Sequence, residues 1–341
     1  MSPPTILTAA AQTILKPSRT MEKIKHLPAA LLDSVDGFVF DCDGVLWRAG
    51  ELCDPRIPAV LQQLRDLKKK VFFVTNNSTK SRATFLAKLN SLGITASPEE
   101  FYTAGFACAE YIRLYEPRLL STHNALLIGM HGLEEELKAC GVNVIGGPSD
   151  QEFEKKMQHF LEESVGNAME KGIFAMHNLE IPKNVGAVVC GFDPRINYFK
   201  IQTAQLCLNA KYNLDVPDCK FIATNPDAVA HITPTQEWAG NGCCVGAIKG
   251  CTGREPSYTG KPSSLLLDIL CSRHSMERSR MVMVGDRLDT DILFGSSNGM
   301  KTVLVLSGVT TEEEAKATTD EMRPDFYMDG VADFFPAPAS A

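Results

Sequence analysis

Long hydrophobic runs, a positive net charge and regular cysteine spacing are all missing from this sequence of 341 residues. No apolar stretch approaches the length that spans a bilayer, so we expect no membrane contact. Lysine and arginine together number 34 against 41 aspartates and glutamates, and no basic stripe extends beyond residues 68–70. This balance argues against a nucleic-acid partner.

The eleven cysteines form no CxxC pair and show no Cys/His spacing typical of a zinc site. They are scattered along the chain, apart from the adjacent Cys243 and Cys244. We therefore predict free thiols in a reducing compartment rather than a disulfide framework. The hydrophobic content of 44% and the charged content of 22% are ordinary for a globular protein.

Residues 1–34 carry the weakest structural signal in the chain. They have no acidic residue before Glu22, contain several serines and threonines, and include Lys16 and Arg19. This composition faintly resembles an organelle transit peptide, but it is short and poor in arginine. We expect a poorly ordered extension before a cytoplasmic domain, with organelle targeting as the alternative. Met21 leaves the start of translation open.

Short apolar runs occur near both ends of the chain. They are rich in β-branched and aromatic residues, which is typical of buried parallel strands covered by helices on both faces. They occupy residues 38–40, 71–74, 281–284 and 302–306. Residues 57–70 and 81–92 have apolar side chains at three- and four-residue spacing, which predicts helices. Strand and helix therefore alternate, as in a doubly wound α/β domain.

The middle of the chain shows the same alternation as a separate unit. Further strands are predicted at "NALLIGM", "VGAVVCGF" and "CKFIAT", and residues 150–172 form a charged, exposed helical segment. We predict an α/β unit inserted into the first one. The expected division is an extension at 1–34, a core domain at 35–119 and 256–336, an inserted domain at 120–255 and a tail at 337–341.

Polar residues follow three of the predicted core strands. The strands lead into "DCDG" at 41–44, into "TNNS" at 75–78 and into "GD" at 285–286. Because ligands bind outside the carboxyl ends of strands in an open parallel sheet, we expect these segments to share one crevice. Lys261, in "TGKPSS", adds a cation on the stretch that leads back to the last core strands.

This set of groups suits a phosphoryl group held against a hard cation. Asp41 and Asp43 lie one residue apart, and a like-charge pair that close is costly unless a cation or proton lies between the carboxylates. Mg²⁺ prefers oxygen ligands and keeps several waters, so a few carboxylate or carbonyl contacts suffice. A threonine hydroxyl, amide donors and a lysine ammonium can contact phosphoryl oxygens.

The motifs "DCDGVLW", "TNNS", "GKPS" and "GDRLDTDI", in this order, resemble the four motifs of the haloacid dehalogenase (HAD) superfamily of phosphatases. The resemblance covers residues 35–335, including "GFDPRINYFKIQTAQ" and "RPDFYMDGVADF", and is strongest to the branch of eukaryotic phosphoglycolate, pyridoxal phosphate and 4-nitrophenyl phosphatases. Only 32 positions separate Asp43 from Thr75, whereas 186 separate Thr75 from Lys261. An inserted domain fits only the second gap, as in the family's α/β-type (C2) cap.

The resemblance implies a role for each matching residue. Asp41 would be the nucleophile that forms an aspartyl-phosphate, and Asp43 the general acid and base. Mg²⁺ would be held by Asp41, by the backbone carbonyl of Asp43 and by Asp286, with Asp291 orienting these ligands. The phosphoryl oxygens would contact Thr75, Asn76, Asn77 and Lys261.

The resemblance also implies a substrate and an assembly. We expect a phosphoric monoester hydrolase whose leading substrate is 2-phosphoglycolate. The alternatives are pyridoxal phosphate, a broad range of sugar and aryl phosphates, transfer of the phosphoryl group to an alcohol, or a catalytically silent regulatory module. Relatives dimerise through the cap, so a homodimer is expected here.

The cap segment "ATNPDAVAHITP", residues 223–234, lies where relatives place a loop that covers the active site. Asn225, Asp227 and His231 are candidates for contacting the organic part of the substrate. For His231 a solvated or dimer-contact role is equally compatible with the sequence. Trp47 is either core packing or a wall of the substrate site.

Three other features favour structural roles. "GNGCCVG", residues 240–246, departs from a dinucleotide fingerprint and predicts a tight turn that opens a helix, with Val245 and Ile248 buried. Asp289 is expected at an exposed helix start, Arg287 in an ion pair with a neighbouring carboxylate, and Arg195 at the surface or at an interface.

Overall fold

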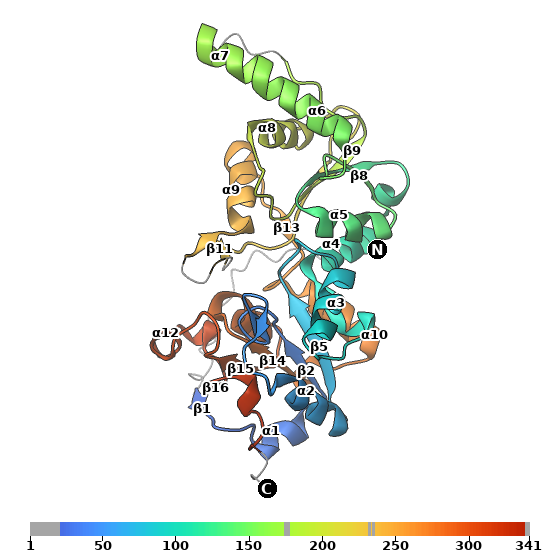
Figure 1. Ribbon diagram of the computed structural model, residues 1–341. Helices are drawn as coiled ribbons and strands as arrows, with labels where there is room; N and C mark the ends of the chain where they lie inside the picture. Colours follow the sequence, from blue (N-terminus) through green and yellow to red (C-terminus); the bar gives the residue numbers. More distant parts are fainter. Residues whose placement is uncertain (1–20, 174–177, 231–232, 234–235, 338–341) are drawn as a thin grey trace, which may run out of the picture.

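The computed structural model describes residues 21–173, 178–230, 233 and 236–337. Two parallel β-sheets, each with helices on both faces, lie one beyond the other along the long direction of the molecule (Figure 1). This arrangement confirms the predicted α/β class with a second α/β unit. No helix within the described ranges is long and apolar enough to cross a membrane, and the eleven cysteines are free.

The first sheet has seven parallel strands in the order β1-β16-β15-β14-β2-β5-β6. All four strands predicted near the chain ends are present. The strands are β1 (Glu22–Lys23), β2 (Gly37–Phe40), β5 (Lys70–Thr75), β6 (Phe101–Thr103), β14 (Met281–Gly285), β15 (Lys301–Val305) and β16 (Phe326–Met328).

Side chains of the first sheet alternate between two apolar layers, as the two-residue period of a strand requires. Phe38 and Phe40 face one layer, whereas Val39 faces the other. Helices α1 (Ala29–Ser34), α2 (Ile57–Asp66) and α3 (Arg82–Ser91) cover the first layer. Helices α4 (Ala104–Tyr115), α10 (Leu265–His274) and α11 (Leu293–Ser297) cover the second. Short helix α12 (Glu312–Ala317) follows β15.

The helix predicted at 57–70 is four residues too long. Helix α2 ends at Asp66, and Lys68 adopts a left-handed backbone conformation with φ of 63°. Lys70 is already the first residue of β5, where it lies opposite Gly37 of β2. Pairing in the central sheet therefore overrides the helical pattern of the "KKK" segment.

The second sheet has five parallel strands in the order β13-β10-β9-β7-β8. They are β7 (Asn124–Ile128), β8 (Asn143–Ile145), β9 (Val185–Cys190), β10 (Lys220–Ala223) and β13 (Ser257–Tyr258). One face packs on α6 (Gln151–His159), α8 (Tyr198–Cys207) and α9 (Asn241–Thr252). The other face packs on α5 (His131–Ala139) and on α4.

Helix α4 belongs to the packing of both sheets. Its Phe106 and Ala107 join the apolar layer of the first sheet, while Cys108, Ala109 and Ile112 join that of the second. The predicted charged segment is α6, a π-helical stretch (Phe160–Val165) and α7 (Gly166–Lys171), which project from the second sheet (Figure 1). A helix shared by two cores limits how far the sheets can move independently.

Two short hairpins complete the described elements: β3 (Trp47–Arg48) with β4 (Glu51–Leu52), and β11 (Val229–Ala230) with β12 (Trp238–Ala239). As predicted, "GNGCCVG" opens a helix, α9, and both Val245 and Ile248 are buried. Because β13 pairs with β10, the second sheet takes in residues 257–258, which were expected in the core domain. The other domain boundaries stay a prediction.

The expectation that residues 1–34 form a poorly ordered extension needs correction for residues 21–34. Strand β1 pairs with β16, and Leu27 N–H donates to the Phe334 carbonyl at 3.0 Å. Ile24, Leu27 and Leu31 are buried in the apolar layer of the first sheet. Together they add to the apolar layer on this face of the sheet.

We predict that Leu27→Ala lowers the free energy of unfolding by about 2 kcal/mol, because it removes a buried side chain from the first core. Denaturant titration of the full chain measures this change. Lys25→Ala is the matched control, since Lys25 is exposed on the same segment, and it should change stability by less than about 0.5 kcal/mol. Equal effects of the two substitutions would contradict the packing of this segment.

Candidate active site

Three strand ends meet at one edge of the first sheet. Asp41 follows β2, Thr75 ends β5 and Asp286 follows β14, and these strands are neighbours in the order β14-β2-β5. The Asp41 N–H donates to the Val284 carbonyl at 2.9 Å, which carries the pairing of β2 with β14 one residue further. The strand register therefore brings side chains from distant parts of the sequence together, as predicted.

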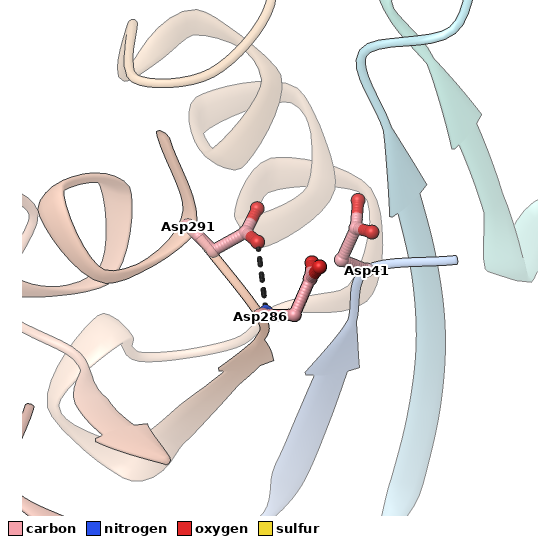
Figure 2. A group of neighbouring side chains, drawn as sticks. All are labelled: Asp41, Asp286 and Asp291. Carbon is pink, nitrogen blue, oxygen red and sulfur yellow. Dashed lines mark hydrogen bonds between the residues drawn. The ribbon is translucent and has the colours of Figure 1, made fainter. Parts of the chain in front are cut away.

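A cluster of three buried carboxylates forms at this edge (Figure 2). Ligand oxygens of Asp41, Asp286 and Asp291 all lie within 4.8 Å of one another. Asp291 lies in a π-helical turn, Leu288–Ile292, and its Oδ2 accepts hydrogen bonds from the backbone N–H of Asp286 (3.2 Å) and Arg287 (3.1 Å). The fold therefore fixes Asp291 through the backbone that carries Asp286.

Lys261 supplies the one ammonium that contacts this cluster among the described residues. Its Nζ donates to Asp41 Oδ1, to Asp291 Oδ1 at 2.7 Å and to the Val74 carbonyl at 3.2 Å. Burial opposes the charged form, but the two carboxylates outweigh it and raise the pKa of Lys261. Burial raises the pKa of Asp41 well above its ordinary value, although the lysine charge opposes this. Lys261 is therefore charged at neutral pH.

The free lone pairs of the cluster fit a hard cation. Asp286 Oδ2 accepts from Val309 N–H at 2.9 Å, whereas Asp286 Oδ1 is buried with no hydrogen-bond partner within the described part of the chain. When all three carboxylates are ionised, the single ammonium leaves two negative charges uncompensated. Burial and the neighbouring Asp291 raise the pKa of Asp286 to about 7. An oxygen-seeking divalent cation would satisfy both the orphaned oxygen and the excess charge.

Two glycines allow backbone to approach Asp286. A Cβ at Gly44 would lie 2.4 Å from Asp286 Oδ2, and one at Gly308 would lie 1.9 Å from it. Gly44 also has a φ of 87°, which favours glycine. The loops after β2 and β15 can therefore close around this carboxylate, and no larger side chain is compatible with either position.

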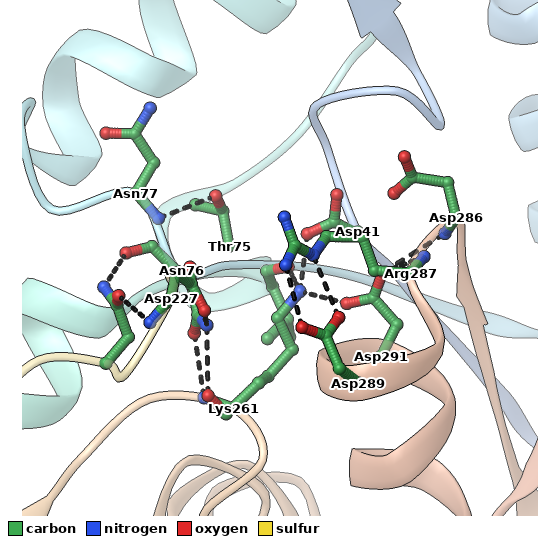
Figure 3. A network of polar contacts seen from close by, with 12 residues as sticks. Asp41, Thr75, Asn76, Asn77, Asp227, Lys261, Asp286, Arg287, Asp289 and Asp291 are labelled. Carbon is green, nitrogen blue, oxygen red and sulfur yellow. Dashed lines mark hydrogen bonds and ion pairs between the residues drawn. The ribbon is translucent and has the colours of Figure 1, made fainter. Parts of the chain in front are cut away.

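The residues expected to hold phosphoryl oxygens lie beside the cluster, but they differ in availability (Figure 3). Thr75 Oγ1 accepts from Asn77 N–H at 3.1 Å. Asn77 Oδ1 accepts from the N–H and hydroxyl of Thr79 at 3.0 and 2.7 Å. These turn contacts hold the Thr75–Ser78 loop in a compact form at the end of β5.

The Asn76 side chain differs from the expectation of a free phosphoryl donor. Its Oδ1 accepts from Lys261 N–H at 2.8 Å, and its Nδ2 donates to the Lys261 carbonyl and to Asp227 Oδ1, both at 3.0 Å. The amide is thus occupied in joining three loops. Sequence spacing did not reveal this, because the partners come from segments far apart in the chain.

Asp43 lies outside the carboxylate cluster. Its side chain is exposed, and its Oδ1 accepts a hydrogen bond from the Trp47 indole N–H at 2.8 Å. Trp47 itself is fully buried. Of the two alternatives for Trp47, the wall of an open substrate site is therefore wrong, and the ring is packed in the core.

The cap segment after β10 reaches the site through two polar residues. Asn225 Nδ2 donates to the Asn76 carbonyl at 2.9 Å, and Asp227 contacts the Asn76 amide. Burial raises the pKa of Asp227, with Arg287 and Asn76 opposing the shift. His231 lies outside the described residues, so its predicted role stays a prediction.

The smaller predictions about charged residues are confirmed. Arg287 pairs with Asp289 at 2.9 Å, and Asp289 is largely exposed. Arg195 is exposed and pairs with Glu154.

Sequence reasoning missed Val309, whose backbone N–H donates to Asp286. The segment "LSGVTT" follows β15 and is a fourth polar strand end, which is the signal that could have indicated this contact.

Comparisons with known proteins show which family this chain resembles. Residues 38–143 match the family described as haloacid dehalogenase-like hydrolase, and residues 258–334 match one described as HAD-hydrolase-like. Phosphoglycolate phosphatase 2 of Arabidopsis thaliana is 44% identical over 305 residues, which cover 89% of this chain and 93% of that protein. Human glycerol-3-phosphate phosphatase is 36% identical, covering 96% of this chain and 99% of that one.

A solved structure extends the likeness to three dimensions. The p-nitrophenyl phosphatase from Archaeoglobus fulgidus superposes with a TM-score of 0.68 at 26% identity, and the match covers 88% of this chain and 97% of that one. The similarity therefore spans both sheets rather than the motif-bearing segments alone.

We predict that the metal-free protein loses stability as the pH rises from about 4 to about 7. The pKa of Asp286 is about 7 in the folded state and has an ordinary value of 3.8, so the folded state binds more protons between these two values. The loss is about 1.4 kcal/mol per pH unit at most. Thermal unfolding in EDTA measures it, and added Mg²⁺ should restore more stability at pH 8 than at pH 5.

Asp286→Asn is the control for this experiment, because it removes the charge and keeps the shape. The variant should show a flatter dependence of the melting temperature on pH and a smaller response to Mg²⁺. A wild-type protein in EDTA whose stability is constant or rises across the window would contradict the assignment of Asp286.

Proposed function

This chain belongs to the haloacid dehalogenase-like hydrolases and is a phosphoric monoester hydrolase, and we propose that it dephosphorylates 2-phosphoglycolate through an aspartyl-phosphate intermediate. The membership agrees with the resemblance inferred from the four motifs. The observation that carries the proposal is the buried contact of Asp41 with Lys261 beside Asp286 and Asp291, at the edge of the sheet where ligands bind.

In the proposed reaction Asp41 attacks the phosphorus atom and the bond to the ester oxygen breaks. Asp43 donates a proton to that oxygen as it leaves, so the alcohol departs neutral. Water then attacks the aspartyl-phosphate, Asp43 takes its proton, and inorganic phosphate and free Asp41 result. Lys261 neutralises charge next to Asp41 throughout, and the backbone and hydroxyl of Thr75 lie where phosphoryl oxygens would be held.

We infer that Mg²⁺ is bound by Asp41, by Asp286 and by the backbone carbonyl of Asp43. When bound, it supplies positive charge that offsets the negative charge of the phosphoryl group and keeps Asp41 ionised. The orphaned Oδ1 of Asp286 supports this assignment. Asp291 has both oxygens engaged by Lys261 and by backbone N–H groups, which suits a residue that orients Asp286 rather than a ligand.

The 44% identity to an Arabidopsis phosphoglycolate phosphatase supports 2-phosphoglycolate as substrate. A second candidate is glycerol 3-phosphate, favoured by the match along nearly the whole length of the human glycerol-3-phosphate phosphatase. Pyridoxal phosphate and aryl phosphates are also phosphomonoesters, and the same reaction would hydrolyse them. The groups that would distinguish these alcohols lie on the cap, where Asn225 and Asp227 reach the core loop.

A homodimer formed through the cap is also proposed. Large apolar side chains are exposed on the inserted unit, among them Met169, Ile173 and Leu214 with 85%, 65% and 77% of their surface accessible. Exposed apolar side chains of this kind are available for a contact with a second copy of the chain. Light scattering should give a mass of twice 37.3 kDa, and a monomer at micromolar concentrations would contradict the proposal.

We predict that the purified protein with Mg²⁺ releases phosphate with a clear preference in kcat/KM for 2-phosphoglycolate. The panel includes glycerol 3-phosphate, pyridoxal 5′-phosphate and p-nitrophenyl phosphate. Asp41→Asn should lower kcat by at least about 10⁴-fold, since it removes the nucleophile. Asp289→Asn is the matched control, because that carboxylate is exposed and outside the cluster.

The outcomes separate the parts of the proposal. Activity that survives in Asp41→Asn contradicts the nucleophile, and a preference for another phosphomonoester replaces the substrate while leaving the chemistry intact. No turnover of any substrate by the wild type, with Mg²⁺ bound, favours a regulatory module. Release of a phosphorylated alcohol instead of phosphate, when glycerol is added, favours a phosphotransferase.

A further inference from the structure

Trp47 is buried, yet its polar edge reaches the exposed Asp43. The side chain has no accessible surface, and the indole N–H donates to Asp43 Oδ1 at 2.8 Å. A buried indole donor needs an acceptor, because an unpaired one costs about 1–3 kcal/mol. Asp43 provides it from a position four residues earlier in the chain.

The backbone between these residues is closed into a tight loop. Gly44 N–H donates to the Trp47 carbonyl at 2.8 Å, and Trp47 N–H donates to the Cys42 carbonyl at 3.2 Å. Asp43 and Trp47 also form a bridge between their backbones. The Cα positions of both residues are thus fixed relative to each other, so the indole sets the side-chain orientation of Asp43.

Helix α3 holds the indole ring in place. The Phe85 ring stacks with it at a centroid distance of 6.5 Å and an interplanar angle of 19°, and the Lys88 Nζ lies 4.0 Å from the ring centroid. A cation over an indole face is attractive when partly desolvated. Burial lowers the pKa of Lys88, with Asp43 opposing the shift. The ring is therefore clamped by two residues one helical turn apart.

We propose that Trp47 is a positioning residue that aims the Asp43 carboxyl group for proton transfer to the leaving oxygen. The inference rests on the proposed role of Asp43 as general acid. An N–H bond to Oδ1 leaves Oδ2 as the oxygen that carries the proton. Without this bond an exposed aspartate samples several rotamers, and fewer of them point at the reacting atoms.

The test compares leaving groups that differ in their need for a proton. Glycerol 3-phosphate and 2-phosphoglycolate release alkoxides, which require protonation, whereas p-nitrophenyl phosphate releases a stable phenolate. Trp47→Phe keeps an aromatic ring at this position but is smaller, and it deletes the N–H. We expect kcat/KM to fall about tenfold or more for the alkyl phosphates and less than about twofold for the aryl phosphate. This parameter reports the phosphoryl-transfer step, before Asp43 acts as base on water.

Phe85→Leu tests the clamp itself. It loosens the packing on the ring and keeps the indole N–H, so it should give an alkyl-selective loss of kcat/KM that is smaller than that of Trp47→Phe. Asp43→Asn should show the largest alkyl-selective loss of kcat/KM among these variants. Adding Trp47→Phe to Asp43→Asn should then produce no further selectivity, because the two residues act through one group.

If Trp47→Phe does not fold, benzothienylalanine at position 47 replaces the N–H by sulfur within the same bicyclic shape. An alkyl-selective loss in either variant supports the positioning role. An equal loss for both substrate types, or none, overturns it and leaves the proposed phosphatase reaction standing. Absence of alkyl selectivity in Asp43→Asn overturns the general-acid role on which the inference rests.

Discussion

The buried ammonium of Lys261 is the interaction on which the site depends. It is 1% exposed and bonds to Asp41 and Asp291, so removing the lysine would leave both buried carboxylates without this cation. Breaking such a buried pair costs about 3–5 kcal/mol, because the remaining charge has left water without a partner. The segments that follow β2 and β14 must therefore assemble around one lysine that arrives from the far side of the inserted unit. The surroundings of Asp41 are therefore built from segments on both sides of the inserted unit.

The loop that carries Lys261 also connects the second sheet to the first. The backbone of Lys261 bonds to Asn76 on both its N–H and its carbonyl, and Asn76 bonds in turn to Asp227. Next to it, Gly260 N–H donates to the Thr224 carbonyl at 2.7 Å, at a position where a Cβ would be 2.5 Å from that oxygen. Helix α4 adds apolar contacts to both cores. The loop that carries Lys261 to Asp41 thus also contacts the second sheet. A shift of that sheet would therefore change the surroundings of Asp41.

The sequence was sufficient for the parts of the site that follow from strand topology. Asp41 and Asp286 end neighbouring parallel strands, and that alone places them at one edge of the sheet. Other contacts at the site cannot be predicted from strand topology. Val309 holds Asp286 through a backbone N–H that every residue but proline possesses. The partner of Asn76 lies 151 positions away in a cap loop, so its polar side chain suggested a substrate contact instead of a contact within the protein. Strand β1 was missed because two residues carry no periodicity.

Trp47 shows that a residue packed in the core can also orient a group at the site. Its ring contributes to the core, and a ring in the core with no accessible surface cannot line an open pocket. Its N–H, however, must be satisfied, and the acceptor is a carboxylate on the opposite side of a four-residue turn. The packing of the ring against Phe85 and Lys88 therefore constrains Asp43, whose side chain is exposed. One hydrogen bond thus links the packed indole to an exposed carboxylate and holds its orientation. Orientation at an exposed catalytic group can be maintained in this way without burying the group itself, which would hinder its exchange of protons with water.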